Sequence, residues 1–361
     1  MQEDELLKGL KYINMIFISE ITNEFNKNGK VNINNIEKRI MNDKDNKNLN
    51  FDKMIYEIKN IINIGFTLDP GFIYQTMLTV TSIMANQKST TKVIFHFGVV
   101  KRFTTAHMLK IYSLKNKINN LTEFNFYYLK KSMIKMKNFH SQGEACPGKF
   151  ELPELLPDNI HKLLLFDAGD VLIFRDLSEL YNYDIHDCWA IGTPEPLGIQ
   201  FTKKYNKTIY INIGSILLNV KELKKKHFFD YYANHRYLKL IGAPDQELFN
   251  ILVPDNKLGY FPFRFGGITP FFNDLYSDQT NVSFWGIEEW LHSNLSINLP
   301  ENPKELYKYI SQLFNPVFVH QITEKWKYGS GLSIYRNLAK YYIKLSGIEA
   351  ELCLKDPGFC E

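Results

Sequence analysis

The chain has 361 residues, of which 45% are hydrophobic and 23% are charged, a composition typical of a globular protein with a large core. Its 43 basic and 39 acidic residues leave a net charge of only +4 without a long block of one sign, so we expect no nucleic-acid partner. The longest apolar runs fall far short of the roughly 20 residues that cross a bilayer, so the sequence predicts no membrane span.

Compartment and covalent chemistry stay open at this stage. The acidic start, Met1 to Glu5, lacks the basic and apolar regions of a signal peptide. We expect a cytoplasmic protein if this is the full chain, or a protein of the secretory lumen if a leader has been removed. The four cysteines show no Cys-x-x-Cys spacing, which argues against structural zinc. Cys353 and Cys360 either close a small loop in an oxidising compartment or stay free thiols.

The pattern of apolar residues in the first 60 residues differs from the pattern in the rest of the chain. Residues 1–60 carry apolar side chains at helical spacing, interrupted by an Asn- and Lys-rich run, and predict a helical N-terminal extension. This extension suits a partner-binding element, a dimer contact or a buttress. From residue 61 onward, short runs of Ile, Val, Phe and Tyr alternate with amphipathic segments, as in βαβ units. We expect strands at 60–68, 92–99, 124–129 and 163–167, and helices at 72–86 and 104–117.

Further elements follow in the second half. We expect strands at 188–192, 208–212 and 215–220, helices at 221–234, 245–252 and 333–345, and an aromatic loop at 260–272. Neither a linker nor an internal repeat separates the halves. The sequence therefore predicts one α/β domain at 61–347, with a Rossmann-like mixed sheet flanked by helices, and a C-terminal tail at 348–361.

Two acidic residues follow a strongly apolar strand. The segment Leu163 to Phe166 runs directly into Asp167, and Asp170 comes three residues later. The carboxyl edge of an α/β sheet is where such folds bind ligands, so the pair is a candidate site. The alternative is a turn in which the two carboxylates only accept backbone hydrogen bonds.

One interpretation of this motif is a phosphohydrolase. Phe166-Asp-Ala-Gly-Asp-Val-Leu172 resembles the first motif of haloacid-dehalogenase-type enzymes, in which Asp167 would attack phosphorus with Mg²⁺ bound nearby. That family places its acid/base Asp two residues after the nucleophile, where this chain has Gly169. The motif also follows several α/β elements instead of opening the domain.

A second interpretation covers residues 61 to 330. Five segments, in this order, resemble those of glycosyltransferase family 8, the metal-dependent, retaining nucleotide-sugar transferases that include glycogenin and bacterial lipopolysaccharide glucosyl- and galactosyltransferases. They are Ile64-Gly-Phe-Thr-Leu-Asp-Pro-Gly-Phe72, Leu165-Phe-Asp-Ala-Gly-Asp-Val-Leu-Ile-Phe-Arg-Asp-Leu-Ser-Glu-Leu180, Tyr210-Ile-Asn-Ile-Gly-Ser-Ile-Leu-Leu-Asn-Val-Lys-Glu-Leu223, Pro244-Asp-Gln-Glu-Leu-Phe-Asn250 and Val317-Phe-Val-His-Gln-Ile-Thr-Glu-Lys-Trp326. The resemblance implies a GT-A-type fold and transfer of a sugar from a UDP-sugar donor to a hydroxyl of a glycan, protein or lipid acceptor.

The resemblance also implies roles for single residues. The metal, Mn²⁺ or Mg²⁺, would be held by Asp167, Asp170 and His320, although on spacing alone His320 reads as a core histidine. The nucleoside would lie on the opening turn, formed by Thr67, Asp69 and Phe72, with Phe72 either stacking on the base or anchoring the helix.

The donor sugar and the reaction involve a further group of residues by the same resemblance. Asn212 and Gly214 would face the donor. Asp245, which also suits a helix N-cap, would bind the sugar hydroxyls, while Gln246 would approach the anomeric carbon in a front-face mechanism. Lys325, otherwise a solvated surface lysine, would place a cation on the departing phosphate.

The chain departs from the family in the acidic motif. The family has Asp-x-Asp, whereas Ala168 and Gly169 both separate the acids here. We expect Gly169 to absorb the additional residue as a bulge. Without that adjustment metal affinity would fall, and a nucleotide-sugar-binding scaffold with weak activity becomes the alternative function.

Overall fold

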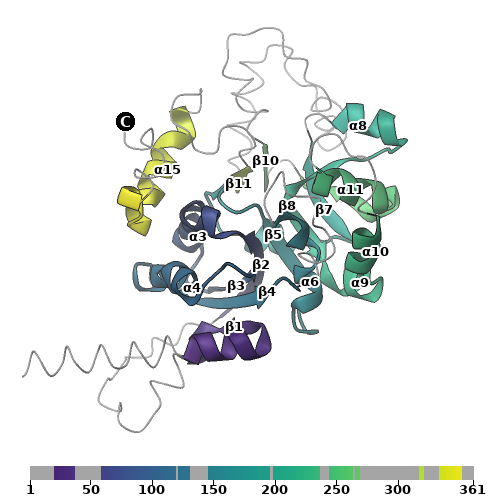
Figure 1. Cartoon of the computed structure of the whole chain (residues 1–361). Coiled ribbons are helices and arrows are strands. Elements are labelled where there is room, and N and C mark those ends of the chain that lie inside the picture. Colours follow the sequence, from purple (N-terminus) through teal and green to yellow (C-terminus); the bar gives the residue numbers. More distant parts are fainter. Residues whose placement is uncertain are drawn as a thin grey trace, which may run out of the picture.

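The computed structural model describes residues 20–36, 58–118, 121–130, 145–195, 198–235, 244–262, 265–268, 317–320 and 333–351. Its centre is a mixed eight-stranded sheet in the order β1-β4-β3-β2-β5-β8-β7-β9 (Figure 1). The strands are β1 (Lys30–Asn32), β2 (Asn60–Leu68), β3 (Thr91–Val99), β4 (Thr122–Tyr128), β5 (Lys162–Phe166), β7 (Ala190–Pro194), β8 (Ile211–Asn219) and β9 (Leu258–Tyr260). A smaller sheet has the order β10-β11-β6, formed by β10 (Gly266–Ile268), β11 (Phe318–His320) and β6 (Val171–Ile173).

Strands β2 to β5 form the parallel half that the apolar runs predict. The connections run through the helices α3 (Ile73–Asn86) and α4 (Thr105–Tyr112), as expected for βαβ units. Phe66, Phe97 and Phe126 lie side by side across β2, β3 and β4, with ring centroids 5.6 and 4.9 Å apart. These strands are buried on both faces, which explains why they read as nearly continuous apolar runs.

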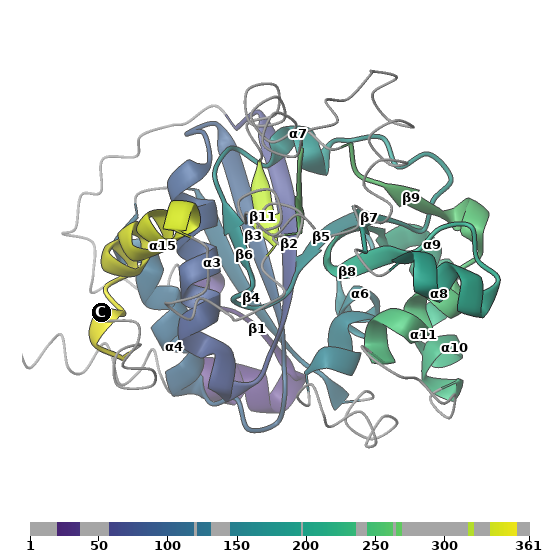
Figure 2. The ribbon, with the colours of Figure 1, turned by 90° about the horizontal axis from the view of Figure 1, so that it is seen from above.

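Both faces of the sheet are covered by helices. On β5, Leu164 and Phe166 belong to one core cluster and Leu163 and Leu165 to the other, because successive strand side chains point to opposite faces. One face carries α3, α4 and α15 (Ser333–Ser346). The opposite face carries α6 (Leu152–Leu155), α9 (Val220–Lys225), α10 (Phe228–Asn234) and α11 (Pro244–Leu252), as Figure 2 shows. The shorter elements are η2 (Pro70–Phe72), η3 (Ser113–Asn116), η5 (Cys146–Lys149), α7 (Ser178–Tyr181), α8 (Gly198–Tyr205) and η6 (Asp255–Lys257).

Part of the N-terminal extension adds to the main sheet. Residues 20–28 are helical, and β1 then pairs antiparallel with β4, with Val31 opposite Phe126. The buried Asn34 side chain donates to the carbonyl of Thr122 and accepts from the amide of Phe124, at 3.1 and 3.0 Å. This segment therefore covers the outer edge of β4, which would otherwise offer unpaired backbone groups.

The predicted helix at 221–234 is wrong, because it is broken at His227. His227 has a left-handed φ of 49°, which separates α9 from α10. Val220 and Leu223 are buried, and one continuous helix at 3.6 residues per turn would turn Asp230 and Tyr231 toward the core after them. The break shifts the phase, so that Phe228, Phe229 and Tyr232 are buried instead.

The two strands predicted at 208–212 and 215–220 are also wrong, because a single strand, β8, spans this region. Gly214 does not end the strand. The additional residues are accommodated against β7, where the pairing register shifts between Gly192 and Thr193. A bulge of this kind lets one strand carry extra residues without leaving the sheet.

Candidate active site

The two predicted acids flank a tight turn at the carboxyl end of β5. The amide of Asp170 donates to the carbonyl of Asp167 at 3.4 Å, and Gly169 has a φ of +84°, as the third residue of a type II turn requires. A Cβ on Gly169 would also lie 2.1 Å from Cβ of Gln75 in α3. The additional residue relative to the Asp-x-Asp pattern is thus absorbed by a turn at Gly169, and not by the bulge that the sequence suggested.

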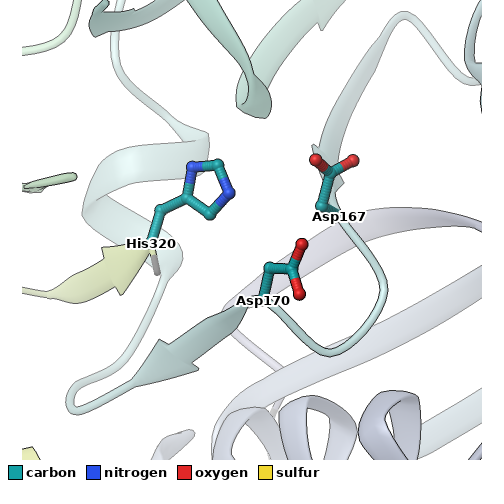
Figure 3. Close-up of side chains that lie close together, drawn as sticks. All are labelled: Asp167, Asp170 and His320. Atoms are coloured by element: carbon teal, nitrogen blue, oxygen red, sulfur yellow. The ribbon is translucent and has the colours of Figure 1, made fainter. Parts of the chain in front are cut away.

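His320 reaches the two acids through the small sheet. In the antiparallel pairing of β11 with β6, His320 lies opposite Val171, the residue after Asp170. Side-chain ligand atoms of Asp167, Asp170 and His320 all lie within 4.8 Å of one another (Figure 3). Strand pairing therefore brings together three residues that the sequence places far apart.

Gly214 has no side chain, and the cluster occupies the space that a side chain at this position would fill. A Cβ at this position would lie 2.1 Å from Cε1 of His320 and 2.7 Å from Oδ2 of Asp167. The carbonyl of Gly214 also accepts from the amide of Asp167 at 2.7 Å. Two carboxylates and one imidazole in such a cradle are a donor set that suits Mn²⁺ or Mg²⁺, so these residues fit the divalent ion that the sequence predicted.

A buried lysine that the sequence reasoning missed connects the acids to α11. The ammonium of Lys149 lies 2.7 Å from Oδ1 of Asp167 and 3.0 Å from Oδ2 of Asp245. Burial alone would lower the pKa of Lys149, but the two carboxylates outweigh burial and raise its pKa well above the ordinary value. The signal was a lysine within the apolar, proline-containing segment Cys146 to Pro153, because lysines are rarely buried without a partner.

Asp245 and Gln246 lie in the first turn of α11, and both are buried. The side-chain oxygen of Gln246 accepts from the amide of Ile213 at 3.1 Å, while its NH2 group donates to Oε2 of Glu195 at 2.8 Å. Asp245 is held differently, by its ion pair with Lys149 and by its place in the first turn of the helix.

Asn212 is held in the same manner. Its side-chain oxygen accepts from the amide of Gly214 at 2.8 Å, and its NH2 group donates to Oε2 of Glu195 at 2.7 Å. Glu195, which the sequence reasoning also missed, lies just after the end of β7. No pattern marks it, because a single glutamate after a strand is common in surface loops.

The predicted nucleoside residues form the turn after β2. Thr67 lies in β2 and is half-buried, whereas Asp69 is buried and precedes η2. Oδ2 of Asp69 accepts from the amide of Ala145 at 3.0 Å, and Arg102 lies 3.6 Å from Oδ1. Phe72 is half-buried at the start of α3.

This nucleoside turn lies next to the acidic turn. Gln75, in the first turn of α3, is the residue that Gly169 approaches closely. The structure therefore brings the predicted nucleoside and metal residues to one region. Lys325, the remaining predicted residue, lies outside the described residues.

Comparison with known proteins identifies the family. A sequence profile described as Glycosyl transferase family 8 matches residues 63–259, more than half of the chain. The chain belongs to glycosyltransferase family 8. The match includes the nucleoside turn, the acidic turn, Asn212 and Gln246, and it favours glycosyl transfer over the phosphohydrolase alternative.

Curated relatives and solved structures agree with this assignment. The chain is 21% identical over 174 residues to probable galacturonosyltransferase-like 4 and 23% identical over 160 residues to probable galacturonosyltransferase-like 3, both from Arabidopsis thaliana. These matches include 47% and 43% of this chain and 47% and 45% of the relatives, so the chain spans about half the length of the curated relatives that it matches.

The fold is similar to that of solved glycosyltransferases. Galactosyltransferase LgtC, in complex with donor and acceptor sugar analogues, has a TM-score of 0.57 at 16% identity, covering 79% of this chain and 95% of LgtC. Glycosyltransferase GlyE from Streptococcus pneumoniae TIGR4 has a TM-score of 0.52 at 15% identity, covering 82% of this chain and 64% of GlyE. The predicted GT-A fold is therefore confirmed. Among the helices that the structure describes, none combines the length and the apolar character that a bilayer span needs.

Proposed function

We propose that this chain is a metal-dependent, retaining glycosyltransferase that moves a sugar from a UDP-sugar donor to a hydroxyl of a carbohydrate or glycoconjugate acceptor. The observation that carries the proposal is the convergence of Asp167, Asp170 and His320 in a chain that belongs to family 8. The two-residue spacing of the acids, which suggested a weakened site, is compatible with this convergence because of the turn at Gly169.

In this proposal Asp167, Asp170 and His320 hold Mn²⁺ or Mg²⁺. The metal, when bound, supplies a Lewis acid that neutralises the charge developing on the departing diphosphate. Lys149 pairs with the half-buried Asp167 and the buried Asp245, so Asp245 is not left as an uncompensated buried charge. Lys325 is proposed to place a second cation on the leaving phosphate.

The nucleoside turn binds the uridine of the donor. The half-buried Phe72 offers a ring face for stacking, and Asp69 offers a carboxylate oxygen to the base. Thr67 lies at the carboxyl end of β2, where α/β sheets bind their ligands. The contact between Gln75 and Gly169 keeps this turn beside the acidic turn, which suits a donor that joins a nucleoside to a diphosphate.

The donor sugar binds between α11 and β8. Asp245 and Asn212 are proposed to bind its hydroxyls, and the glycine at position 214 leaves room for the donor. Gln246 is proposed to approach the anomeric carbon. A neutral amide is a weak nucleophile, which favours attack by the acceptor from the side that the diphosphate leaves and hence retention of configuration.

The experiment that tests the proposal is thermal unfolding with nucleoside diphosphates and nucleotide sugars, each with Mn²⁺ and with a chelator. We expect UDP or a UDP-sugar to stabilise the chain only with the metal, by about 2.7 kcal/mol at 100 times the dissociation constant. Proton NMR during donor turnover identifies the anomer of the sugar that is released first. Retention requires that this anomer has the same configuration as the sugar in the donor. Equal stabilisation with and without chelator would contradict the proposed metal dependence. If neither UDP nor any UDP-sugar stabilises the chain, the proposed donor is wrong.

The matched variant is Asp170→Asn, which keeps the shape and removes one charged ligand. Asp170 is preferable to Asp167, because Asp167 also pairs with Lys149. We expect Asp170→Asn to lose the metal-dependent stabilisation. The control is Glu123→Gln, which removes a carboxylate on β4 that pairs with Lys92 on β3, and it should behave as the unchanged chain.

A further inference from the structure

Glu195 lies at a fixed place relative to β8. β7 pairs with β8 up to Pro194, opposite Ile211, and the amide of Glu195 then donates to the carbonyl of Tyr210 at 3.4 Å. The backbone of Glu195 therefore continues the pairing beyond the strand. Its side chain is held beside the segment of β8 that approaches the metal cluster.

One oxygen of Glu195 accepts two amides. Oε2 lies 2.7 Å from the side-chain nitrogen of Asn212 and 2.8 Å from that of Gln246. A carboxylate can only accept hydrogen bonds, so both NH2 groups must turn toward it. Hydrogen bonds to an ionised acceptor are also about twice as strong as neutral ones.

The oxygen ends of the same amides are fixed by consecutive backbone groups. Asn212 accepts from Gly214 and Gln246 accepts from Ile213, at 2.8 and 3.1 Å. Each amide is thereby held at both its nitrogen and its oxygen end. These groups lie beside Gly214, which contacts the metal cluster at Asp167.

We propose that Glu195 is a positioning residue of the donor-sugar subsite, which holds the amides of Asn212 and Gln246 in one orientation toward the sugar. This inference rests on the proposed function, because it assumes that a nucleotide sugar is bound there. Small errors in the placement of such groups lower rates by up to about 100-fold.

The test compares Glu195→Gln and Glu195→Ala with the unchanged chain and with the control Glu123→Gln. Affinities for UDP and for the UDP-sugar are measured with Mn²⁺, together with kcat and KM for donor turnover. We expect both Glu195 variants to bind UDP normally and to lose the additional affinity that the sugar provides. We expect kcat to fall about tenfold for Glu195→Gln, which keeps one acceptor oxygen, and about 100-fold for Glu195→Ala.

A double-mutant cycle separates positioning from an independent role. Because Glu195 acts through Gln246 and Asn212, Glu195→Gln should cost clearly less in a Gln246→Ala background than in the unchanged chain. If Glu195→Gln lowers kcat by the same factor in both backgrounds, the two residues act independently and the proposal is overturned. The same holds if the Glu195 variants turn over donor as fast as the control. A wild-type chain that binds no nucleotide sugar would instead overturn the proposed function, and this inference with it.

Discussion

Two buried polar networks in this molecule differ in charge and in place. The neutral network, formed by Asn63, His96, Tyr127 and Tyr181, lies within the parallel half of the sheet. The charged network, formed by Lys149, Asp167 and Asp245, lies at the carboxyl end of β5 and the start of α11.

The hydrogen bonds of the neutral network form one chain in which each side chain donates to the next. Nε2 of His96 donates to Asn63, whose amide donates to the Tyr181 hydroxyl, and that hydroxyl donates to the carbonyl of Lys162. Nδ1 of His96 then accepts from the hydroxyl of Tyr127 at 3.1 Å. A neutral ring fits this chain, and burial lowers the pKa of His96 to about 3.

The charged network is arranged differently. Its carboxylates are balanced by Lys149, and Asp167 also faces His320 and Asp170. The comparison teaches that buried polar groups in the sheet interior are closed among themselves and serve the fold. Those at the strand ends bring charged side chains together, as the proposed metal site requires.

The largest expected effect comes from removing the cation of the charged network. Lys149→Met leaves the buried carboxylate of Asp245 without its ammonium, so the free energy of unfolding should fall by about 3–5 kcal/mol in urea titrations. Adding Asp245→Asn should recover much of this loss, because it removes the uncompensated charge. A double variant as unstable as Lys149→Met would show that charge does not explain the loss.

Between pH 7 and pH 5, we expect protonation of His96 to destabilise the neutral network. The pKa of His96 is about 3 in the folded chain, against an ordinary value of 6.5, so between these two pH values the unfolded chain binds more protons. Stability is then full above about pH 6.5 and falls as the pH is lowered, by about 2 kcal/mol at pH 5.

Urea unfolding at pH 7 and pH 5 measures this loss, with His96→Gln as the variant that removes the titrating ring. We expect the variant to be less stable at pH 7 but to depend less on pH. Equal pH dependence in both proteins would exclude His96 as the source.

The sequence predicts the parallel half well and the second half less well. Buried parallel strands read as continuous apolar runs, and β2 has the predicted bounds of 60–68. In the second half, the break at His227 and the register shift at Gly192 depend on packing between elements. Local patterns do not encode such adjustments.

The candidate site shows the same division. Asp167 and Asp170 could be predicted because they follow an apolar strand. His320 depended on the resemblance, since only its pairing opposite Val171 brings it to the acids. Lys149 lies in a single helical turn and Glu195 in a loop, and their partners come from the turn after β5, from β8 and from α11. Tertiary structure alone makes these two side chains part of the site.

The smallest expected effect comes from removing one hydroxyl of the neutral network. Tyr181→Phe takes the acceptor from the amide of Asn63 and the donor from the carbonyl of Lys162, with bonds of 2.9 and 3.0 Å. We expect the free energy of unfolding to fall by about 1–3 kcal/mol, because both partners lose a hydrogen bond in a buried environment. Tyr231→Phe, which removes a hydroxyl from an exposed tyrosine, is the matched control and should change little. If the two variants unfold at the same urea concentration, the neutral network is not closed as described, and its contrast with the charged network fails.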